Sequence, residues 1–122
     1  MSEFGFNRRL RITRPADYQR VFAAPVKSGS SAFTVLATCN DRQQPRLGLA
    51  IAKKHMRRAV DRNRVKRQIR ESFRLYKDTL PAIDVVVLAK HVTNKKTNSE
   101  LAAALKQHWQ NLVTQCAKSS CS

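Results

Sequence analysis

The fold is decided by the stretch from Arg46 to Ala89, which reads RLGLAIAKKHMRRAVDRNRVKRQIRESFRLYKDTLPAIDVVVLA. Residues 46–52 alternate bulky and small side chains, and this pattern predicts a strand with one smooth face. Apolar residues then recur at helical spacing from about Ala59 to Lys77, and Pro81 prevents the helix from continuing. Residues 83–89 are apolar on both faces, which is typical of a central strand. If the two strands are parallel, the three elements form a βαβ unit, and such crossovers are normally right-handed.

A short helix is predicted near the N-terminus. Thr13 can cap this helix and Pro15 suits its first turn. Tyr18, Val21 and Phe22 fall on one face of it. A shared apolar face of this kind is more often core than a surface for a ligand.

The remaining segments complete a mixed fold. Residues 33–39 alternate like a strand and are expected to form a hairpin with residues 46–52, and residues 26–28 can add a short strand. A capping box of Thr97 and Glu100 opens a last helix. The helical repeat of that helix is formed by Leu101, Leu105, Trp109, Leu112 and Cys116. The predicted order is α-β-β-(β)-α-β-α, and the fold class is an α/β (α+β) sandwich of two layers.

The charge balance points to a polyanionic partner. The chain has 122 residues, with 24 Lys or Arg against 8 Asp or Glu, and a net charge of +16. Its length predicts a single domain over residues 1–122, with an extended basic arm at 1–12 and a frayed tail at 118–122, and the charge excess predicts that this domain binds nucleic acid, RNA in our interpretation. Nucleic acid is the commonest partner for such a domain. The apolar runs are far shorter than the roughly 20 residues of a membrane span, and no secretory signal is visible. We therefore expect no membrane partner and a cytoplasmic protein.

The basic helix strengthens the case for nucleic acid. Eleven cations lie between residues 53 and 77, where only Asp61 and Glu71 oppose them. Val65, Ile69, Ser72 and Tyr76 share a narrow face, with Phe73 at its border, so the helix packs through one stripe and exposes most of its cations. A ladder of like charge runs along it at i, i+4 spacing through Arg62, Lys66, Arg70 and Arg74. Each step costs about 0.2–0.5 kcal/mol unless a polyanion lies alongside, so we favour binding over a merely solvated face.

The residues that could carry chemistry are scattered. Three cysteines without CxxC spacing indicate reduced thiols, with Cys39 and Cys116 packed as small apolar groups and Cys121 in the tail. His55 could touch phosphate, whereas His91 and His108 are expected at the surface or an edge. The acids are spread over unrelated elements: Glu3, Asp17, Asp41, Asp61, Glu71, Asp78, Asp84 and Glu100. Two-metal phosphodiester chemistry needs several carboxylates close together, so we expect no catalytic residue and no metal site in the protein.

The basic helix contains the motif Arg62-Asn63-Arg64, followed by Lys66-Arg67 and Arg70-Glu71. With this motif, the helix resembles that of the protein component of bacterial ribonuclease P. Further similarity covers about 110 residues in the same order and spacing, through Leu10-Arg11, Asp17-Tyr18, Val21-Phe22, Arg46-Leu47-Gly48-Leu49, Ala52-Lys53-Lys54 and Asp84 to Ala89. There are two departures: Tyr18 stands where many members have Phe, and residues 55–58 replace a turn that commonly contains Gly.

The resemblance implies a fold, a function and partners. The fold would be similar to ribosomal protein S5 domain 2, with a left-handed βαβ crossover in place of the usual hand. The chain would be the non-catalytic protein subunit of an endoribonuclease that removes the 5′ leader from precursor tRNA. The family's RNA supplies the active site and its Mg²⁺ ions, so the protein would hold no cofactor tightly. The implied partners are ribonuclease P RNA and precursor tRNA, and no protein partner is expected.

The resemblance and the basic helix together assign two groups of site residues. The group expected to bind the catalytic RNA is Arg57, Arg58, Arg62, Asn63, Arg64, Lys66, Arg67, Arg70 and Arg74. The group expected to form a cleft for the leader is Arg11, Tyr18, Phe22, Gly48, Ala50, Ala52, Lys53 and Lys54. Within the cleft we expect Tyr18 to be mostly a platform on which bases stack and Phe22 to be mostly core.

Two other functions fit the composition. A structural RNA-binding protein of ribosomal or assembly-factor type would be equally basic, and only the resemblance argues against it. An autonomous nuclease is the third hypothesis, and the scattered carboxylates argue against that one.

Overall fold

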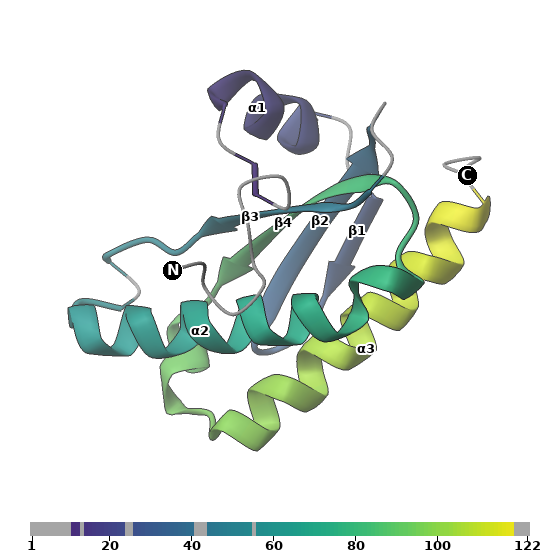
Figure 1. The fold of residues 1–122 in the computed structure, drawn as a ribbon. Helices are drawn as coiled ribbons and strands as arrows, with labels where there is room; N and C mark the ends of the chain where they lie inside the picture. The colour runs from purple at the N-terminus through teal and green to yellow at the C-terminus, as the bar shows by residue number, and fades with distance from the viewer. Residues whose placement is uncertain (1–10, 13, 24–25, 41–43, 55, 119–122) are drawn as a thin grey trace, which may run out of the picture.

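The computed structural model describes residues 11–12, 14–23, 26–40, 44–54 and 56–118. Its elements are α1 (Pro15–Ala23), β1 (Val26–Gly29), β2 (Phe33–Cys39), β3 (Arg46–Ala50), α2 (Ala59–Tyr76), β4 (Ile83–Ala89) and α3 (Asn98–Lys118), with short 3-10 helices η2 (Lys77–Thr79) and η3 (His91–Lys95). α2 and α3 cover one face of the sheet, and α1 crosses the other (Figure 1). The predicted order is confirmed, including the short extra strand. Thr13, most of the basic arm and the end of the tail lie outside the described residues.

The four strands form one sheet in the order β1-β2-β4-β3. β2 is antiparallel to β1 and to β4, whereas β3 is parallel to β4. The expected hairpin of residues 33–39 with residues 46–52 is therefore wrong, because β4 lies between those two strands. The physical reason is the composition of β4: a strand that is apolar on both faces is most stable where it is covered on both faces and paired on both edges.

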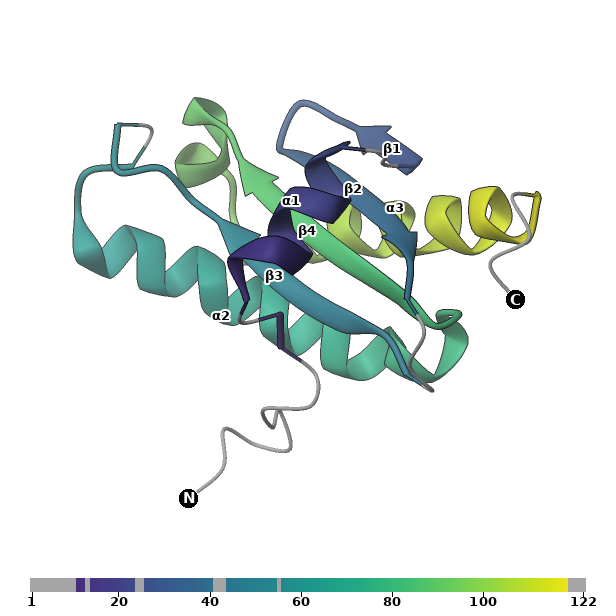
Figure 2. The same cartoon turned by 90° about the horizontal axis from the view of Figure 1, so that it is seen from above.

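The connection from β3 through α2 to β4 is left-handed. Seen from the α1 side, with both strands pointing up, β4 lies to the right of β3 and α2 lies behind the sheet (Figure 2). The right-handed crossover expected for a βαβ unit in general is therefore wrong here, and the left-handed crossover implied by the family resemblance is confirmed.

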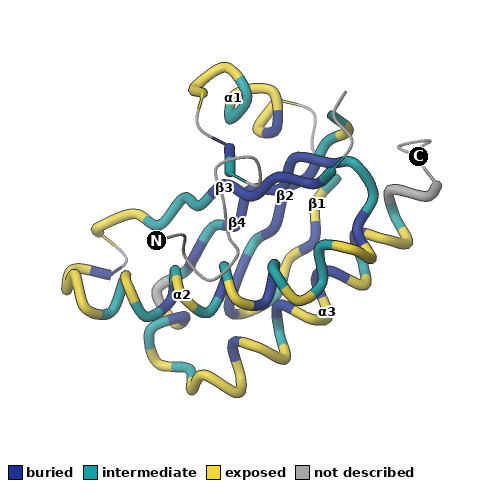
Figure 3. The backbone as a smooth tube through the Cα atoms, in the orientation of Figure 1, coloured by how far each residue is buried: buried dark blue, intermediate teal, exposed yellow. Residues whose placement is uncertain are grey.

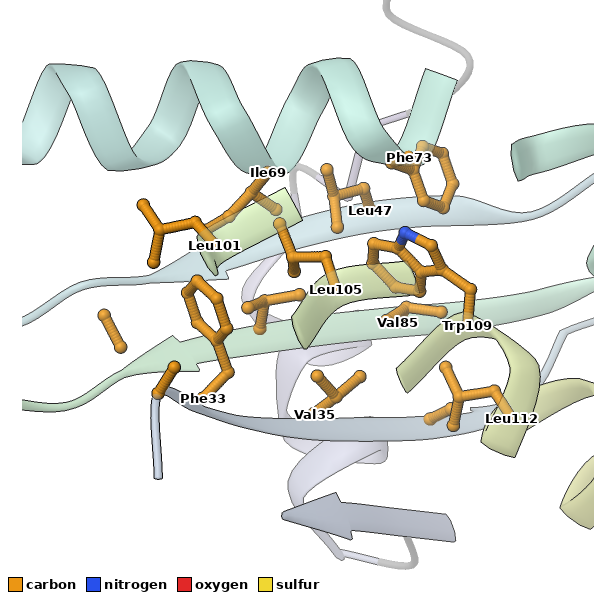
Figure 4. Packing of buried hydrophobic residues seen from close by; sticks show 14 of the residues in the cluster. Phe33, Val35, Leu47, Ile69, Phe73, Val85, Leu101, Leu105, Trp109 and Leu112 are labelled. Carbon is orange, nitrogen blue, oxygen red and sulfur yellow. The ribbon is translucent and has the colours of Figure 1, made fainter. Parts of the chain in front are cut away.

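The main core lies between the sheet and the helices α2 and α3 (Figure 4). The sheet contributes Phe33, Val35 and Val85, and every apolar position predicted for α3 up to Leu112 is fully buried. Trp109 stands edge-on to Phe73 with ring centroids 5.8 Å apart, and its indole N–H donates to the hydroxyl of Ser72 at 2.8 Å. The buried indole nitrogen is therefore satisfied, as burial requires. Figure 3 shows the contrast with α1, which is exposed along most of its length.

A buried carboxylate links α1 to the face of the sheet that this helix crosses. Asp84 on β4 is inaccessible to solvent and receives two hydrogen bonds from Arg46 of β3, at 2.8 and 2.7 Å. Asn40 donates a third at 2.9 Å, and Arg20 of α1 pairs with the same carboxylate. Burial alone would raise the pKa of Asp84, but the hydrogen bonds from Arg46 and Asn40 and the charges of both arginines outweigh it and lower that pKa. This network joins α1 to the sheet.

A polar cluster fastens α3 to β1. His108 is buried, against expectation, and its ring nitrogens lie 2.7 Å from the hydroxyl of Ser28 and 2.9 Å from that of Ser30. Burial, and then the positive charge of Lys90, lower the pKa of His108. His108 therefore favours the neutral form, in which one nitrogen accepts and the other donates.

The expectation for the cysteines is also corrected. Cys39 is exposed at the end of β2 and is disulfide-bonded, so it is neither a reduced thiol nor a buried apolar group. An alternating strand indicates which residues share a face, but the last residue of that strand extends past the helices that cover the face. The side chains of Cys116 and Cys121 lie outside the described part of the chain.

Replacing Asp84 by Asn is expected to lower the free energy of unfolding by about 3–5 kcal/mol, because Arg46 would keep its buried charge without a full counter-charge. Denaturant unfolding measures this change. The control is Asp78→Asn, since the Asp78 side chain is 93% exposed in its pair with Lys77 and such pairs contribute little. A loss below about 1 kcal/mol for Asp84→Asn would contradict the role of the network.

The lowered pKa of His108 predicts how stability depends on pH. The unfolded chain binds a proton near pH 6.5 and the folded chain only at lower pH. The free energy of unfolding should therefore fall as the pH drops below about 6.5. Thermal unfolding between about pH 7.5 and 5.5 tests this prediction, with His108→Gln as the comparison. The melting temperature should fall more steeply with decreasing pH for the unmodified protein than for His108→Gln. The same dependence on pH in both proteins would show that His108 does not titrate as expected.

Candidate nucleic-acid interface

α1 covers only part of its face of the sheet. Val21 is buried with Ile12, Leu36 and Val86 beneath the helix. Beyond this cluster, one row of paired residues crosses all four strands, and it consists of Gly29, Thr34, Leu88 and Ala50. We call this row the sheet floor. Its members are exposed or partly exposed, and they are small except for Leu88, so they form a smooth open surface beside α1.

Phe22 is more exposed than expected, whereas Tyr18 is partly exposed and also packs against the sheet. Tyr18 is half-buried, and its ring lies directly on Gly48: a Cβ at Gly48 would meet ring carbon Cε1 at 2.7 Å. Phe22 is 46% exposed and is the free aromatic ring of α1. Gly48 is thus covered by the protein itself, and the open part of the smooth strand is Ala50 and the exposed Ala52.

A hollow of about 220 Å³ lies at the outer edge of β3. Its lining residues are Arg11, Ile12, Tyr18, Leu47, Leu49, Lys66 and Arg70. Arg11 pairs with Leu47, and the amide of Ile12 donates to the carbonyl of Leu47 at 2.9 Å, so residues 11–12 run along this edge. Nε of Arg11 is buried and has no hydrogen-bond partner among the described residues. Three cations from two separate parts of the chain therefore meet around one hollow.

The hollow joins the two groups of predicted site residues. Lys66 and Arg70 were assigned to the catalytic RNA, whereas Arg11 and Tyr18 were assigned to the leader cleft. The sequence could not show that these two groups meet, because a helical wheel shows which residues of α2 are exposed but not which other segment of the chain lies beside them. Lys53 and Lys54 are exposed in the turn that follows β3.

The other residues predicted to bind the catalytic RNA differ in their surroundings. Arg57, Arg58, Asn63 and Arg67 are exposed, as expected for a binding surface. Arg74 is paired with Glu71, and its hydrogen bond lowers the pKa of that carboxyl group. This confirms Glu71 as an internal partner for an arginine.

Arg62 and Arg64 face the protein. The guanidinium group of Arg62 donates to the carbonyls of Met56 and Arg57 at 3.0 and 2.7 Å, which fixes the turn before α2. Arg64 donates to residues of η3 and the start of α3. A charge pattern along one helix could not reveal these contacts, because the accepting groups are loop carbonyls and an amide.

The described residues also limit other kinds of site. No helix among them is long and apolar enough to cross a membrane. Within the same ranges, His, Cys, Asp and Glu side chains form no group of three that could hold a metal ion.

The fold and this surface define a class: a small α/β protein whose cations surround a smooth sheet face. The family model described as Ribonuclease P matches residues 6–113. A ribonuclease P protein component of Nitrosococcus oceani is 48% identical over 119 residues, which cover 98% of this chain and 100% of that protein. The corresponding protein of Haemophilus influenzae strain PittGG is 43% identical with the same coverage.

A solved structure agrees with these relatives. The ribonuclease P protein of Staphylococcus aureus superposes with a TM-score of 0.77 at 31% identity, covering 84% of this chain and 93% of that one. The chain therefore belongs to the ribonuclease P protein family, as a protein subunit of that endoribonuclease.

Gly48→Ala is expected to destabilise the protein by about 1–3 kcal/mol, because the new methyl group would force Tyr18 off the strand. When Gly48→Ala is introduced into the Tyr18→Ala variant, it should lower the free energy of unfolding far less, because the Tyr18 ring is absent. Denaturant unfolding of the two single variants and the double variant measures this coupling. Additive losses would show that Tyr18 does not rest on Gly48 in solution.

Proposed function

We propose that this subunit binds ribonuclease P RNA through α2 and holds the 5′ leader of precursor tRNA on the sheet floor. The observation that carries the proposal is the hollow where Arg11 and Tyr18 meet Lys66 and Arg70 at the edge of β3, the strand that contributes Ala50 to that floor. A single-stranded leader has no duplex shape to recognise, so its binding needs smooth surfaces, an aromatic ring and cations for the phosphates. This surface offers all three in one place.

Each part of the surface has a proposed role. Phe22, with its exposed ring, is the platform for a leader base, and Tyr18 supports β3 and borders the hollow. Ala50 and Ala52 leave room for the leader's backbone, and Lys53 and Lys54 bind its phosphates at the end of the strand. The cations proposed to contact the catalytic RNA directly are Arg57, Arg58, Lys66, Arg67, Arg70 and Arg74, with Asn63 among them.

The chemistry is proposed to belong to the RNA subunit and its Mg²⁺ ions. These carboxylates of the chain are already engaged in internal contacts: Asp84 and Asp17 with Arg46, Asp61 with Arg58, Glu71 with Arg74, and Glu100 with the backbone N–H of Thr97. Two-metal hydrolysis needs carboxylates that are free and convergent. The protein's part is to bind, orient and neutralise phosphate charge, and we infer that it does so in the cytoplasm.

Reconstitution tests this function directly. Adding the protein to ribonuclease P RNA at moderate Mg²⁺ should accelerate removal of the leader from precursor tRNA, because the protein supplies cations where the RNA alone has only repulsion. A structural RNA-binding protein of ribosomal type would leave the cleavage rate unchanged. Cleavage at the mature 5′ end by the protein without RNA would contradict the assignment of catalysis to the RNA.

Phe22→Ala should weaken binding of precursor tRNA to the holoenzyme by about 1–3 kcal/mol and leave binding of mature tRNA nearly unchanged, since mature tRNA has no leader. The variant should unfold at nearly the same temperature as the unmodified protein, because the Phe22 ring is about half exposed. Leu75→Ala is the matched control, since Leu75 is an exposed apolar side chain on α2. Equal losses for precursor and mature tRNA would remove Phe22 from the leader site.

A further inference from the structure

Arg64 joins three segments of the chain through one guanidinium group. Its Nη1 donates to the side-chain oxygen of Asn98 at 2.6 Å, and its Nη2 donates to the carbonyls of Asn94 and Lys96 at 3.1 and 3.2 Å. These acceptors belong to η3, to the residue that follows it and to the first residue of α3. A planar guanidinium can serve such a spread of acceptors at once, whereas a lysine ammonium offers only a point charge on a flexible stem.

η3 is held from two further directions. Thr93 is fully buried, and its hydroxyl donates to the carbonyl of Ala32 just before β2. The side chain of Asn94 donates to Asp61 of α2 at 3.3 Å. Figure 1 shows this segment passing beside the N-terminal half of α2. The short turn between β4 and α3 is therefore held by α2 and by the residue that precedes β2.

The turn presents two adjacent cations. Lys95 is exposed and Lys96 is partly exposed. Asp61 brings this turn next to the start of α2, because it accepts from Asn94 and also pairs with Arg58 at 3.9 Å. The side chain of Arg58 is itself 76% exposed. The turn that carries Lys95 and Lys96 thus lies beside the N-terminus of α2, where Arg58 is the N-cap residue, and the acid between them, Asp61, is already engaged.

We propose that Lys95 and Lys96 form a second phosphate-binding surface for ribonuclease P RNA, and that Arg64 contributes to RNA binding by positioning this surface. This inference rests on the proposed function and adds to it a segment that no helix pattern singles out. Arg64 is a positioning residue in this scheme: its guanidinium group binds protein, and the lysines that it holds in place bind RNA. Two consecutive lysines on a fixed turn can meet successive phosphates without first being ordered, which preserves their contribution to affinity.

The test measures the salt dependence of binding to ribonuclease P RNA. The variants are Lys95→Ala with Lys96→Ala, Arg64→Ala, Arg64→Lys, and the three alanine substitutions combined. Arg67→Ala is the positive control because Arg67 is exposed on α2, and Lys106→Ala is the negative control because Lys106 lies on α3 beside the groove between α2 and α3. Thermal unfolding is recorded for every variant.

The double lysine variant should keep its melting temperature and flatten the log–log salt slope by about 0.7–0.9 for each lost phosphate contact. Arg64→Lys should flatten the slope much as Arg64→Ala does, although it keeps the charge. Adding Arg64→Ala to the double lysine variant should flatten the slope no further, because both changes remove the same contacts.

Three outcomes would overturn the inference. If Arg64→Lys kept the original slope, the charge of Arg64 would itself be binding phosphate. If the double lysine variant bound with an unchanged slope while Arg67→Ala flattened it, η3 would lie outside the interface and the proposed function would stand. If Arg67→Ala also left the slope unchanged, the proposed α2 interface would fail together with this inference. The double lysine variant keeps the test decisive even if the Arg64 variants fold poorly.

Discussion

The ion pair between Arg46 and Asp84 is the constraint on which the functional face depends. It places a charge near the start of β4, an interior strand that is otherwise apolar on both faces, and that charge requires partners at close range. Arg46 supplies them from β3, and Arg20 reaches the same carboxylate from α1. The pair thus fixes α1 over one end of the sheet and leaves the sheet floor open at the other. If α1 lay further toward the sheet floor, it would cover the surface proposed to bind the leader.

The excess of positive charge is divided between two tasks. Arg20, Arg46, Arg62 and Arg64 bind acceptors within the protein, where their guanidinium groups fix a helix or a turn. The remaining cations of α2 and the turns beside it face outward and repel one another until a polyanion arrives. The Arg-Asn-Arg motif therefore combines both tasks. Its two arginines hold the adjacent loops in place, and the exposed residues around them form the binding surface.

The sequence predicts which helices and strands form better than it predicts which of them lie side by side. The helices, the central strand β4 and the capping box at Thr97 follow from periodicity and composition alone. The hairpin prediction failed because alternation indicates which residues share a face and says nothing about which strand lies beside them. The expected burial of Phe22 was wrong for a similar reason, since Tyr18 and Phe22 share a helical face but only the Tyr18 ring lies over Gly48. His108 lies three residues after Leu105 and four before Leu112, so the helical repeat indicates its burial, but only the packed structure reveals its serine partners.

The central claim is that the open sheet face beside α1 binds single-stranded RNA. The most direct measurement is an NMR titration of the isotope-labelled protein with a short single-stranded RNA of the leader sequence. Amide signals of Gly29, Thr34, Ala50 and Leu88 should shift together and saturate, along with the ring signals of Phe22, while those of the groove between α2 and α3 stay in place. Shifts confined to the outer surface of α2, with the sheet floor unperturbed, would contradict the claim.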